Sequence, residues 1–323
     1  MEHKLLGRTG VRVSPLCFGT MSFGGDADRE TSAAMYAACR DRGINFFDCA
    51  NSYQRGVAEE ILGDLIAGHR DELVITSKVY NQMADDVNAR GANRRHIARA
   101  VEDSLRRLKT DRLDVYFLHM WDAETPIEET LRGLEDLVAA GKVLYLGASN
   151  FAAWQIAKAL GISERRGWAR IDVLQPMYNL VKRQAEVELL PLARAEELAV
   201  ISYSPVGGGL LSGKYRAEQR PNQGRLITNA QYAKRYGDDW VYDTAAAFTE
   251  KAAALGVHPV TLAVAWAAGH PGITCPIIGA RSVEQLQPSL AALDFALSAE
   301  ERDAVSALSR TPPPATDRLE EAG

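Results

Sequence analysis

The stretch Leu73-Val74-Ile75-Thr76-Ser77-Lys78 decides the fold, because it is a short apolar run that ends in a charged residue. Two other runs have the same form, Ile44-Asn45-Phe46-Phe47-Asp48 and Leu113-Asp114-Val115-Tyr116-Phe117-Leu118-His119. Short runs rich in Val, Ile and Phe are typical of buried strands. In α/β folds, polar residues at the carboxyl ends of parallel strands usually carry the chemistry. The residues that this pattern brings together, with Tyr53 five positions after Asp48, are Asp48, Tyr53, Lys78 and His119.

Outward from this stretch, short apolar runs alternate with amphipathic segments along the chain. Eight such strand–helix units predict a closed (β/α)8 TIM barrel and one domain over residues 1–323. A doubly wound open sheet is the alternative, but no Gly-x-Gly-x-x-Gly follows the first strand, which argues against a Rossmann fold. The expected strands are 16–19, 44–48, 73–78, 113–118, 143–147, 173–175, 200–202 and 277–278. The expected helices are 29–42, 58–67, 94–108, 127–140, 154–160 and 185–197.

Three segments lie outside this alternation. Residues 3–13 predict a hairpin with a turn at Arg8-Thr9-Gly10. Residues 204–240 form a long connection rich in glycine and polar residues, and loops of this length in compact domains are usually functional or disordered. Ser298 and Glu301 have the spacing of a capping box and predict an extra helix near the C-terminus.

Composition and charge exclude several classes of protein. The net charge is −5 and the chain has no Lys/Arg-rich block, so nucleic acid is not an expected partner. The longest apolar stretch, 259–280, is interrupted by Gly269-His270-Pro271-Gly272 and predicts a helix, a turn and a strand rather than a membrane span. Four scattered cysteines show neither metal-ligand spacing nor a disulfide framework, which favours a reducing, cytoplasmic location. No obligate protein partner is evident.

The motifs together resemble those of the aldo-keto reductase family. The family's Asp-x-Ala-x-x-Tyr element matches Asp48-Cys49-Ala50-Asn51-Ser52-Tyr53, and its lysine and histidine elements match the runs that end at Lys78 and His119. Further elements follow in the family's order at 147–150, 175–179 and 203–205. The resemblance implies a (β/α)8 barrel with an N-terminal hairpin closing its bottom and an extra C-terminal helix. It also implies reduction of an aldehyde or ketone to an alcohol with NADP(H), possible in both directions.

Carbonyl reduction needs a proton donor beside an oxygen that becomes anionic. Tyr53 can donate, but a tyrosine with a pKa near ~10 needs help, and a neighbouring Lys78 cation is expected to lower that pKa. Asp48 would hold and compensate Lys78, and His119 would orient the substrate carbonyl. The alternatives are a buried Asp48–Lys78 ion pair that only sets register, and an ordinary core histidine. A zinc site is not expected, because no third ligand is placed beside His119 and Asp48.

The resemblance also implies a set of cofactor-binding residues. Ser149, Asn150 and Gln175 would hold the nicotinamide carboxamide, with Tyr203 stacked beneath the ring. A glycine-rich loop at 204–214 would contact the pyrophosphate, and Arg281 would bind the adenosine 2′-phosphate and favour NADPH. The implied set is Thr20, Met21, Ser149, Asn150, Gln175, Tyr203, Ser204, Pro205, Val206, Gly208, Leu210, Ser212, Lys214, Arg225, Gly279, Arg281 and Gln285.

The chain departs from the family pattern at three places. Pro288 and Ser289 stand where the family often has a Glu-Asn pair that contacts adenine, which weakens the expected preference for NADPH. Gln54 follows the tyrosine where glycine is common, and Cys49 replaces a common threonine. Neither of the last two changes alters the four residues expected to be catalytic.

Aromatic residues just past the strand ends are expected to line the substrate pocket, and aromatic walls favour apolar or ring-shaped carbonyl compounds. Each of these aromatics could instead only anchor a loop. A different functional class is a cofactor-binding regulatory or sensor subunit with little turnover, a role that some family members have for ion channels. A metal-dependent barrel hydrolase is a further, weaker alternative. The expected pocket residues are Phe23, Tyr80, Trp121, Tyr232 and Trp240.

Overall fold

Eight parallel strands close into a barrel in the computed structural model, which describes residues 1–215 and 224–316. The strands follow one another around the barrel in chain order, and the last one pairs with both the first and the second-to-last. The predicted (β/α)8 barrel is therefore confirmed. The barrel strands are β3 (Cys17–Gly19), β4 (Phe46–Asp48), β5 (Val74–Val79), β6 (Leu113–Leu118), β7 (Val143–Ser149), β8 (Ile171–Gln175), β9 (Ala199–Ser202) and β10 (Cys275–Ile278).

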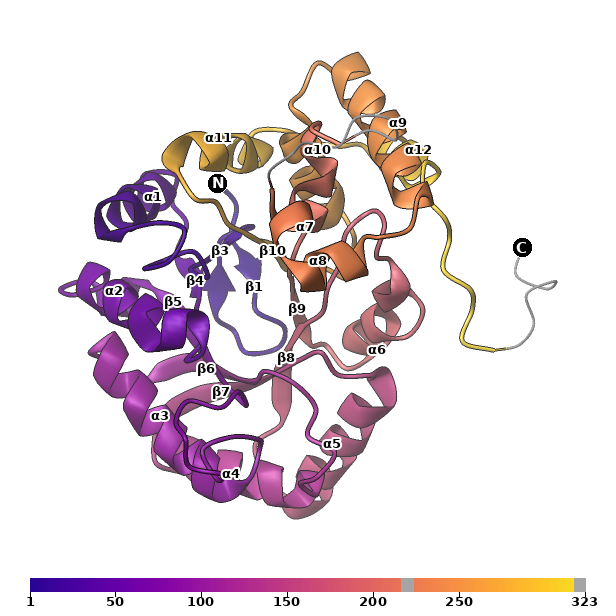
Figure 1. Cartoon of the computed structure of the whole chain (residues 1–323). Helices are drawn as coiled ribbons and strands as arrows, with labels where there is room; N and C mark the ends of the chain where they lie inside the picture. The colour runs from indigo at the N-terminus through magenta and orange to yellow at the C-terminus, as the bar shows by residue number, and fades with distance from the viewer. Residues whose placement is uncertain (216–223, 317–323) are drawn as a thin grey trace.

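Helices surround the barrel and cover the outer faces of its strands (Figure 1). Most of them connect consecutive strands, as the alternating sequence pattern predicts. The helices are α1 (Arg29–Asp41), α2 (Val57–Leu65), α3 (Arg94–Leu108), α4 (Ile127–Ala139), α5 (Ala153–Arg166), α6 (Leu189–Ala195), α7 (Arg225–Thr228), α8 (Ala230–Arg235), α9 (Trp240–Ala254), α10 (Pro259–Ala268), α11 (Val283–Leu290) and α12 (Ala299–Ser306). Short 3-10 turns are η1 (Tyr53–Gly56), η2 (Arg70–Glu72), η3 (Gln184–Glu186), η4 (Gly207–Ser212) and η5 (Ala291–Leu293).

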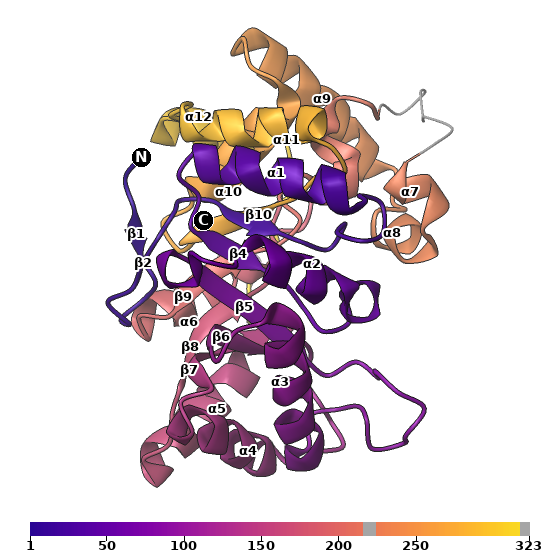
Figure 2. The ribbon, with the colours of Figure 1, turned by 90° about the vertical axis from the view of Figure 1, so that its left-hand side faces the viewer.

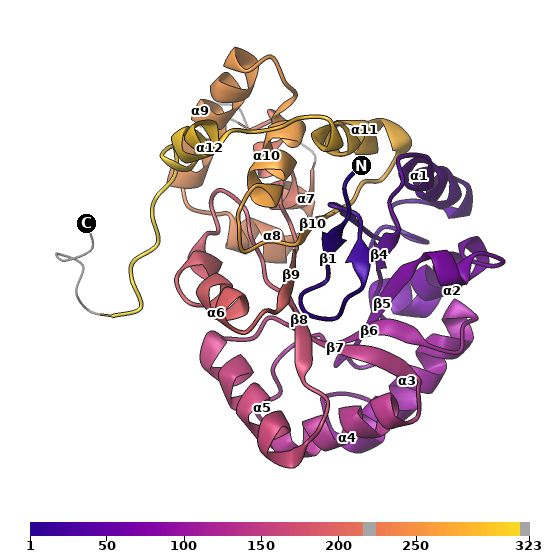
Figure 3. The ribbon, with the colours of Figure 1, turned by 180° about the vertical axis from the view of Figure 1, so that it is seen from behind.

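The N-terminal hairpin closes one end of the barrel, as expected. It consists of β1 (Lys4–Leu5) and β2 (Arg12–Val13), and the rear view shows it in front of the barrel strands (Figure 3). Leu6 and Val13 are fully buried and pack into the cluster that fills the barrel interior. In the side view, the hairpin lies at the opposite end of the barrel from α7 and α8 (Figure 2). The open end is therefore the carboxyl end of the strands.

The core has two layers because alternate strand residues point inward and outward. Inward residues such as Phe46, Val115 and Phe117 fill the barrel, and outward residues such as Phe47 and Ile75 pack against the helices. Gly147 shows how tightly the interior is filled, because a Cβ there would lie 2.4 Å from the ring of Phe117. Packing at this density holds the strand ends in fixed positions.

Side-chain caps fix where several helices begin. Asp28 accepts a hydrogen bond from the Thr31 amide before α1. The predicted capping box before α12 is confirmed, since Ser298 accepts from the Glu301 amide and the Glu301 carboxylate accepts from the Ser298 amide. Such caps satisfy the free amides of the first helical turn.

The structure differs from the sequence prediction mainly after β9. The connection at 204–240 contains η4, α7 and α8, because Leu226 and Tyr236 are buried and anchor it; residues 216–223 within it lie outside the described residues. Helix α9 is not marked by the sequence pattern, because its many alanines give little contrast between its faces. The helix expected at 185–197 is divided into η3 and α6, and the helix expected at 154–160 extends over 153–166.

No single helix in the described residues is long and apolar enough to cross a bilayer. Only α9 and α10 together meet that length and composition, and they are bent by 97° at their junction.

Candidate active site

The pleat of three neighbouring strands brings the predicted polar residues to one place. Phe46 and Val74 point into the barrel, so Asp48 and Lys78, two and four positions further along, point inward as well. The same alternation from Phe117 directs His119 inward. Strand register places Asp48 opposite Thr76, so the inward residues meet at the carboxyl end of the barrel.

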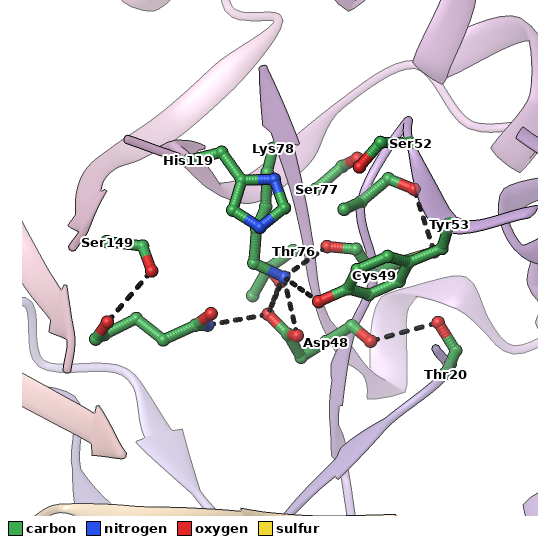
Figure 4. Close-up of polar contacts among 12 residues, drawn as sticks. Thr20, Asp48, Cys49, Ser52, Tyr53, Thr76, Ser77, Lys78, His119 and Ser149 are labelled. Carbon is green, nitrogen blue, oxygen red and sulfur yellow. Dashed lines mark hydrogen bonds and ion pairs between the residues drawn. The ribbon is translucent and has the colours of Figure 1, made fainter. Parts of the chain in front are cut away.

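Asp48 and Lys78 form a buried ion pair at the centre of this end (Figure 4). The Lys78 Nζ lies 2.7 Å from Asp48 Oδ1 and 2.6 Å from Asp48 Oδ2, and it also donates to the Cys49 carbonyl at 2.7 Å. Asp48 Oδ1 accepts further bonds from Thr76 Oγ1 at 2.8 Å and from Gln175 Nε2 at 2.9 Å. Burial alone would lower the pKa of Lys78, but the Asp48 carboxylate, together with Tyr53 and Cys49, outweighs burial and the pKa lies above its ordinary value. Lys78 is therefore a permanent cation.

Tyr53 lies within hydrogen-bond distance of this cation, with 3.3 Å between Lys78 Nζ and the phenol oxygen. Burial raises the pKa of Tyr53 to about 12, because it outweighs the lowering effect of Lys78. Lys78 therefore lowers the pKa of Tyr53, as expected, but the net shift is upward because burial has the larger effect. Tyr53 remains protonated throughout the neutral range and is able to act as an acid.

His119 completes the group of four, which we call the tetrad (Asp48, Tyr53, Lys78 and His119). Its ring lies edge-on to Tyr53, with 6.1 Å between ring centroids and an interplanar angle of 77°. Burial and the Lys78 cation lower the pKa of His119 to about 4. The imidazole is therefore neutral at physiological pH and carries one N–H. Hydrogen bonding or packing thus joins all four residues predicted from the strand ends.

Three of the residues expected to hold the nicotinamide lie on β7 and β8 and the loop after β7. Ser149 Oγ donates to the Gln175 carbonyl at 2.9 Å, and Gln175 is in turn bound to Asp48. Asn150 has a left-handed backbone with φ 60°, which is uncommon outside glycine and clusters at functional sites. Its side chain donates to the His119 carbonyl at 2.9 Å and accepts from Tyr203 Oη at 2.7 Å.

The glycine-rich loop after β9 has the backbone that the sequence suggests. Gly207, Gly208 and Gly209 have φ values of 62°, 68° and 102°, and a Cβ on Gly208 would lie 2.6 Å from the ring of Tyr232. Ser204 is also left-handed, with φ 63°. The other expected residues of this region lie in the loop, in η4 and at the start of α7: Pro205, Val206, Leu210, Ser212, Lys214 and Arg225.

The last expected cofactor residues lie at the start of α11, beside the end of β10. The backbone of Gly279 approaches that of Gly19 closely, since a Cβ on Gly279 would lie 3.5 Å from the Gly19 carbonyl oxygen. Arg281 precedes the helix, and its amide donates to Gln285 Oε1 at 3.3 Å. The Arg281 guanidinium is paired with Asp26, with 3.0 Å between Nε and Oδ2. Asp26 also lies 3.8 Å from Arg225, so one carboxylate joins two loops expected to contact the cofactor.

Thr20 and Met21 follow β3 at the same end of the barrel. Thr20 is fully buried and its hydroxyl donates to the Asp48 carbonyl at 3.1 Å, whereas Met21 is 38 % exposed. Thr20 therefore supports the strand that carries Asp48, and Met21 is accessible at the rim.

The aromatic residues expected in the substrate pocket have different positions. The prediction that Phe23 lines the pocket is wrong, because Phe23 is fully buried in the core. Its ring packs on that of Phe18, with 5.8 Å between the ring centroids. Tyr232 packs against Gly208, and its ring lies beneath the guanidinium groups of Arg225 and Arg235. Trp240 begins α9, and its ring centroid lies 4.8 Å from the guanidinium carbon of Arg310.

Tyr80 and Trp121 are half-buried just beyond the strands that carry Lys78 and His119. Trp121 forms an aromatic cluster with Phe151 and Trp154, at centroid distances of 5.3 and 5.6 Å. Trp154 is 60 % exposed, so this cluster has an accessible face.

Sequence reasoning missed four polar residues that contact the tetrad or the residues expected to bind the cofactor. Thr76 binds Asp48, Ser52 and Asn81 bind one another beside His119, and Asp26 holds Arg281. Thr76 could have been found from strand alternation, since it is two residues before Lys78. The other three lie in loops, where no periodicity predicts direction. In residues 1–215 and 224–316, no three His, Cys, Asp or Glu side chains gather closely enough to bind a metal ion.

Comparison with known proteins agrees with this architecture. The model of the Aldo/keto reductase family matches residues 15–310, so the chain belongs to the aldo/keto reductase family. Members of this family generally bind a nicotinamide cofactor, and the chain is an oxidoreductase of this family.

Three relatives illustrate the range of proteins that this chain is similar to. An uncharacterized oxidoreductase, YrpG of Bacillus subtilis, is 38% identical over 312 residues, which cover 93% of each chain. A probable voltage-gated potassium channel subunit beta of Arabidopsis thaliana is 36% identical over 91% of this chain and 92% of its own. The norsolorinic acid reductase stcV of Emericella nidulans is 35% identical over 93% of this chain and 79% of its own.

Proposed function

We propose that this protein reduces an aldehyde or ketone to an alcohol with NADPH, and that the tetrad is its catalytic group. The observation that carries the proposal is the position of the Tyr53 hydroxyl, 3.3 Å from a lysine cation that Asp48 holds on both carboxylate oxygens. A neutral imidazole lies edge-on to the ring of the same tyrosine. This is a proton donor next to a fixed positive charge and a second hydrogen-bond donor, the set that a developing alkoxide needs.

The chain's own residues act on the carbonyl oxygen. A bound nicotinamide would supply the hydride to the carbonyl carbon. His119 donates its N–H to the oxygen and sets its direction, and Tyr53 passes its proton to that oxygen as negative charge develops there. A Tyr53 pKa of about 12 suits this step, because an alkoxide is a stronger base than a phenolate. Lys78 stabilises the resulting phenolate.

Several features of the structure fit a dinucleotide cofactor. Three consecutive left-handed glycines, 207–209, carry no side chains, so a phosphate at this loop would meet main chain rather than side chains. The amino end of α11 adds a favourable dipole for an anion, and Arg281 stands at that end. A guanidinium beside a helix start favours a phosphate on the adenosine ribose, and hence NADPH over NADH.

The substrate proposed is an apolar, ring-shaped carbonyl compound. Trp121, only two residues beyond His119, packs with Phe151 and the exposed Trp154. These rings meet edge to face, at interplanar angles of 86° and 61°, and offer an apolar wall beyond the tetrad against which a ring-shaped substrate would pack.

The test is to titrate NADPH and NADH into the purified protein by nucleotide fluorescence and then follow NADPH consumption with a panel of aldehydes and ketones. The panel should include norsolorinic acid, since the names of several relatives contain it. Tyr53→Phe serves as the matched control, because it removes one oxygen and leaves the ring. We expect it to bind NADPH normally and to lose about 10²–10⁴-fold in turnover, the usual contribution of a general acid. Equal loss of binding and turnover would mean that Tyr53 is structural.

A second candidate function is a regulatory subunit that binds the cofactor but turns over slowly. It is favoured by two relatives, from Arabidopsis thaliana and Oryza sativa, that are each named probable voltage-gated potassium channel subunit beta and are 36% and 35% identical to this chain. Tight NADPH binding with no consumption across the whole panel would support this function over the reductase.

A further inference from the structure

Asn81 contacts the catalytic histidine in a way that the sequence does not indicate. It lies two residues beyond β5, and its amide nitrogen is 3.2 Å from His119 Nδ1 and 3.2 Å from Ser52 Oγ. Ser52 directly precedes Tyr53. One amide group therefore bridges the ring of His119 and the segment that carries the proposed proton donor.

The chemistry of this contact limits the state of the imidazole. An amide NH₂ group can only donate, so the ring nitrogen that faces it must be an acceptor. With the lone pair on Nδ1, the single N–H of the neutral ring is on Nε2. A doubly protonated ring would present N–H to N–H at Asn81, so this contact also disfavours the imidazolium.

Other groups around His119 also affect the protonation of its ring or fix its main chain. Lys78 on β5 disfavours a second positive charge on the ring, whereas Asp48 on β4 opposes this more weakly. Tyr53 on η1 packs edge-on against the ring. The His119 amide donates to the Val79 carbonyl at 2.9 Å, which fixes the backbone but leaves the ring free to rotate. Asn81 supplies a polar contact to the ring itself.

Figure 4 shows where the two ring nitrogens of His119 point. One ring nitrogen of His119 points toward the head groups of Lys78 and Tyr53, and the other points toward the side on which Ser52 lies. The nitrogen directed at the tetrad is the one that must carry a hydrogen if His119 is to donate to a carbonyl oxygen.

We propose that Asn81 is a positioning residue, which holds His119 in the Nε2–H form and ties its ring, through Ser52, to the segment of Tyr53. This inference rests on the proposed reductase function for its effect on turnover, but the form of the imidazole can be measured without turnover. Asn81 touches neither the proton that is transferred nor the reacting carbon.

The experiment compares Asn81→Asp, Asn81→Ala and the control Gln82→Ala. Asp has the shape of Asn but only accepts, so it should pull the hydrogen to Nδ1 and leave a lone pair on Nε2 facing the substrate oxygen. Gln82 is the exposed neighbour, whose amide donates to the Ala84 carbonyl at 2.8 Å.

The primary readout is the long-range ¹H–¹⁵N spectrum of the histidine rings, in which the two neutral tautomers have different nitrogen shifts. The chain has six histidines, so the spectrum of His119→Gln identifies the His119 signals. We expect the Nε2–H form in the natural protein and in Gln82→Ala, the Nδ1–H form in Asn81→Asp, and a mixture in Asn81→Ala.

Turnover is the second readout. We expect kcat to fall about 10²-fold in Asn81→Asp, as for the loss of one donor to a developing oxyanion, and less in Asn81→Ala. NADPH binding should not change in either variant. An Nδ1–H ring in the natural protein would overturn the proposal, because it would mean that the Asn81 oxygen faces the ring. An unchanged spectrum and unchanged kcat in both Asn81 variants would overturn it as well. If no carbonyl compound is reduced by the natural protein, the reductase function fails, while the spectra still decide the role of Asn81.

Discussion

Replacing Lys78 with methionine tests the electrostatic basis of the proposed chemistry. The change keeps an unbranched side chain and removes the charge that lies 3.3 Å from the Tyr53 oxygen. At this separation and an effective dielectric constant of about 20, Coulomb's law gives about 5 kcal/mol between ammonium and phenolate. The phenolate of Tyr53 would lose this stabilisation, so its pKa should rise further above about 12.

The effect on rate follows from how much charge has developed in the transition state. If half of the phenolate charge is present there, about 2.5 kcal/mol is lost, which is about 70-fold in kcat for reduction. Alcohol oxidation passes through the same transition state, so its kcat/KM at a fixed pH should fall by the same factor as that of reduction. The assay is steady-state NADPH consumption and formation, with NADPH affinity measured separately by fluorescence.

Stability needs its own control, because the single variant leaves Asp48 buried beside no cation. Breaking a buried pair in this way costs about 3 to 5 kcal/mol, a large part of the stability of an ordinary domain. The double variant Asp48→Asn/Lys78→Met removes both charges and should recover most of the lost stability in a thermal or urea unfolding measurement. Turnover should remain low in the double variant. A folded double variant with kcat within threefold of the natural protein would refute the role given to Lys78.

The remaining predictions concern pH, cofactor choice and folding. Since Tyr53 is protonated below a pKa of about 12, reduction should not lose its acid between pH 6 and pH 10, whereas oxidation should become faster as pH rises over this range; a fall of both rates together would contradict this assignment. Arg281→Ala should weaken NADPH binding about 10- to 100-fold, the worth of a charge-assisted hydrogen bond, and leave NADH binding nearly unchanged, so parallel losses in fluorescence titrations would argue against a 2′-phosphate contact. Asp26→Asn frees Arg281 from a half-exposed ion pair, so it should tighten NADPH binding about two- to fivefold and leave NADH binding unchanged. Weaker NADPH binding in this variant would show instead that the Asp26 carboxylate holds Arg281 in place. Ser298→Ala removes the cap of α12 and should lower the free energy of unfolding by about 1 kcal/mol, while Glu300→Ala, on the same helical turn but outside the capping box, should change it much less.

The fold and the tetrad were predictable because their signals are local. A run such as 73–78 begins with three apolar residues, ends in a charged one and is buried on both faces, as a strand between barrel interior and helices is. Asp48, Lys78 and His119 each end a run of this kind, so their common location follows from parallel strands. Helix α9 and the division near α6 could not be predicted, because an alanine-rich segment and a segment interrupted by Pro191 have weak or broken periodicity.

The prediction of residues just past the strand ends met a different limit. Phe23 follows the same strand as Thr20 and Met21, yet it is buried in the core while Met21 is at the surface. Direction within a loop depends on which distant residues fill the space around it. Sequence position alone therefore placed Phe23 near the site without revealing where its side chain points.

The sequence by itself determined the order of strands and helices, the closed barrel and the four polar residues at its open end, because periodicity and strand termination are properties of neighbouring residues. Only the tertiary structure decided the net pKa of Tyr53, the pairing of Asp26 with Arg281 and the contact of Asn81 with His119. These depend on burial and on distances of a few ångströms between side chains such as Asn81 and His119, which are 38 positions apart in the chain. Electrostatic energies and hydrogen bonds vary steeply over such distances, and they are set by packing rather than by local sequence pattern.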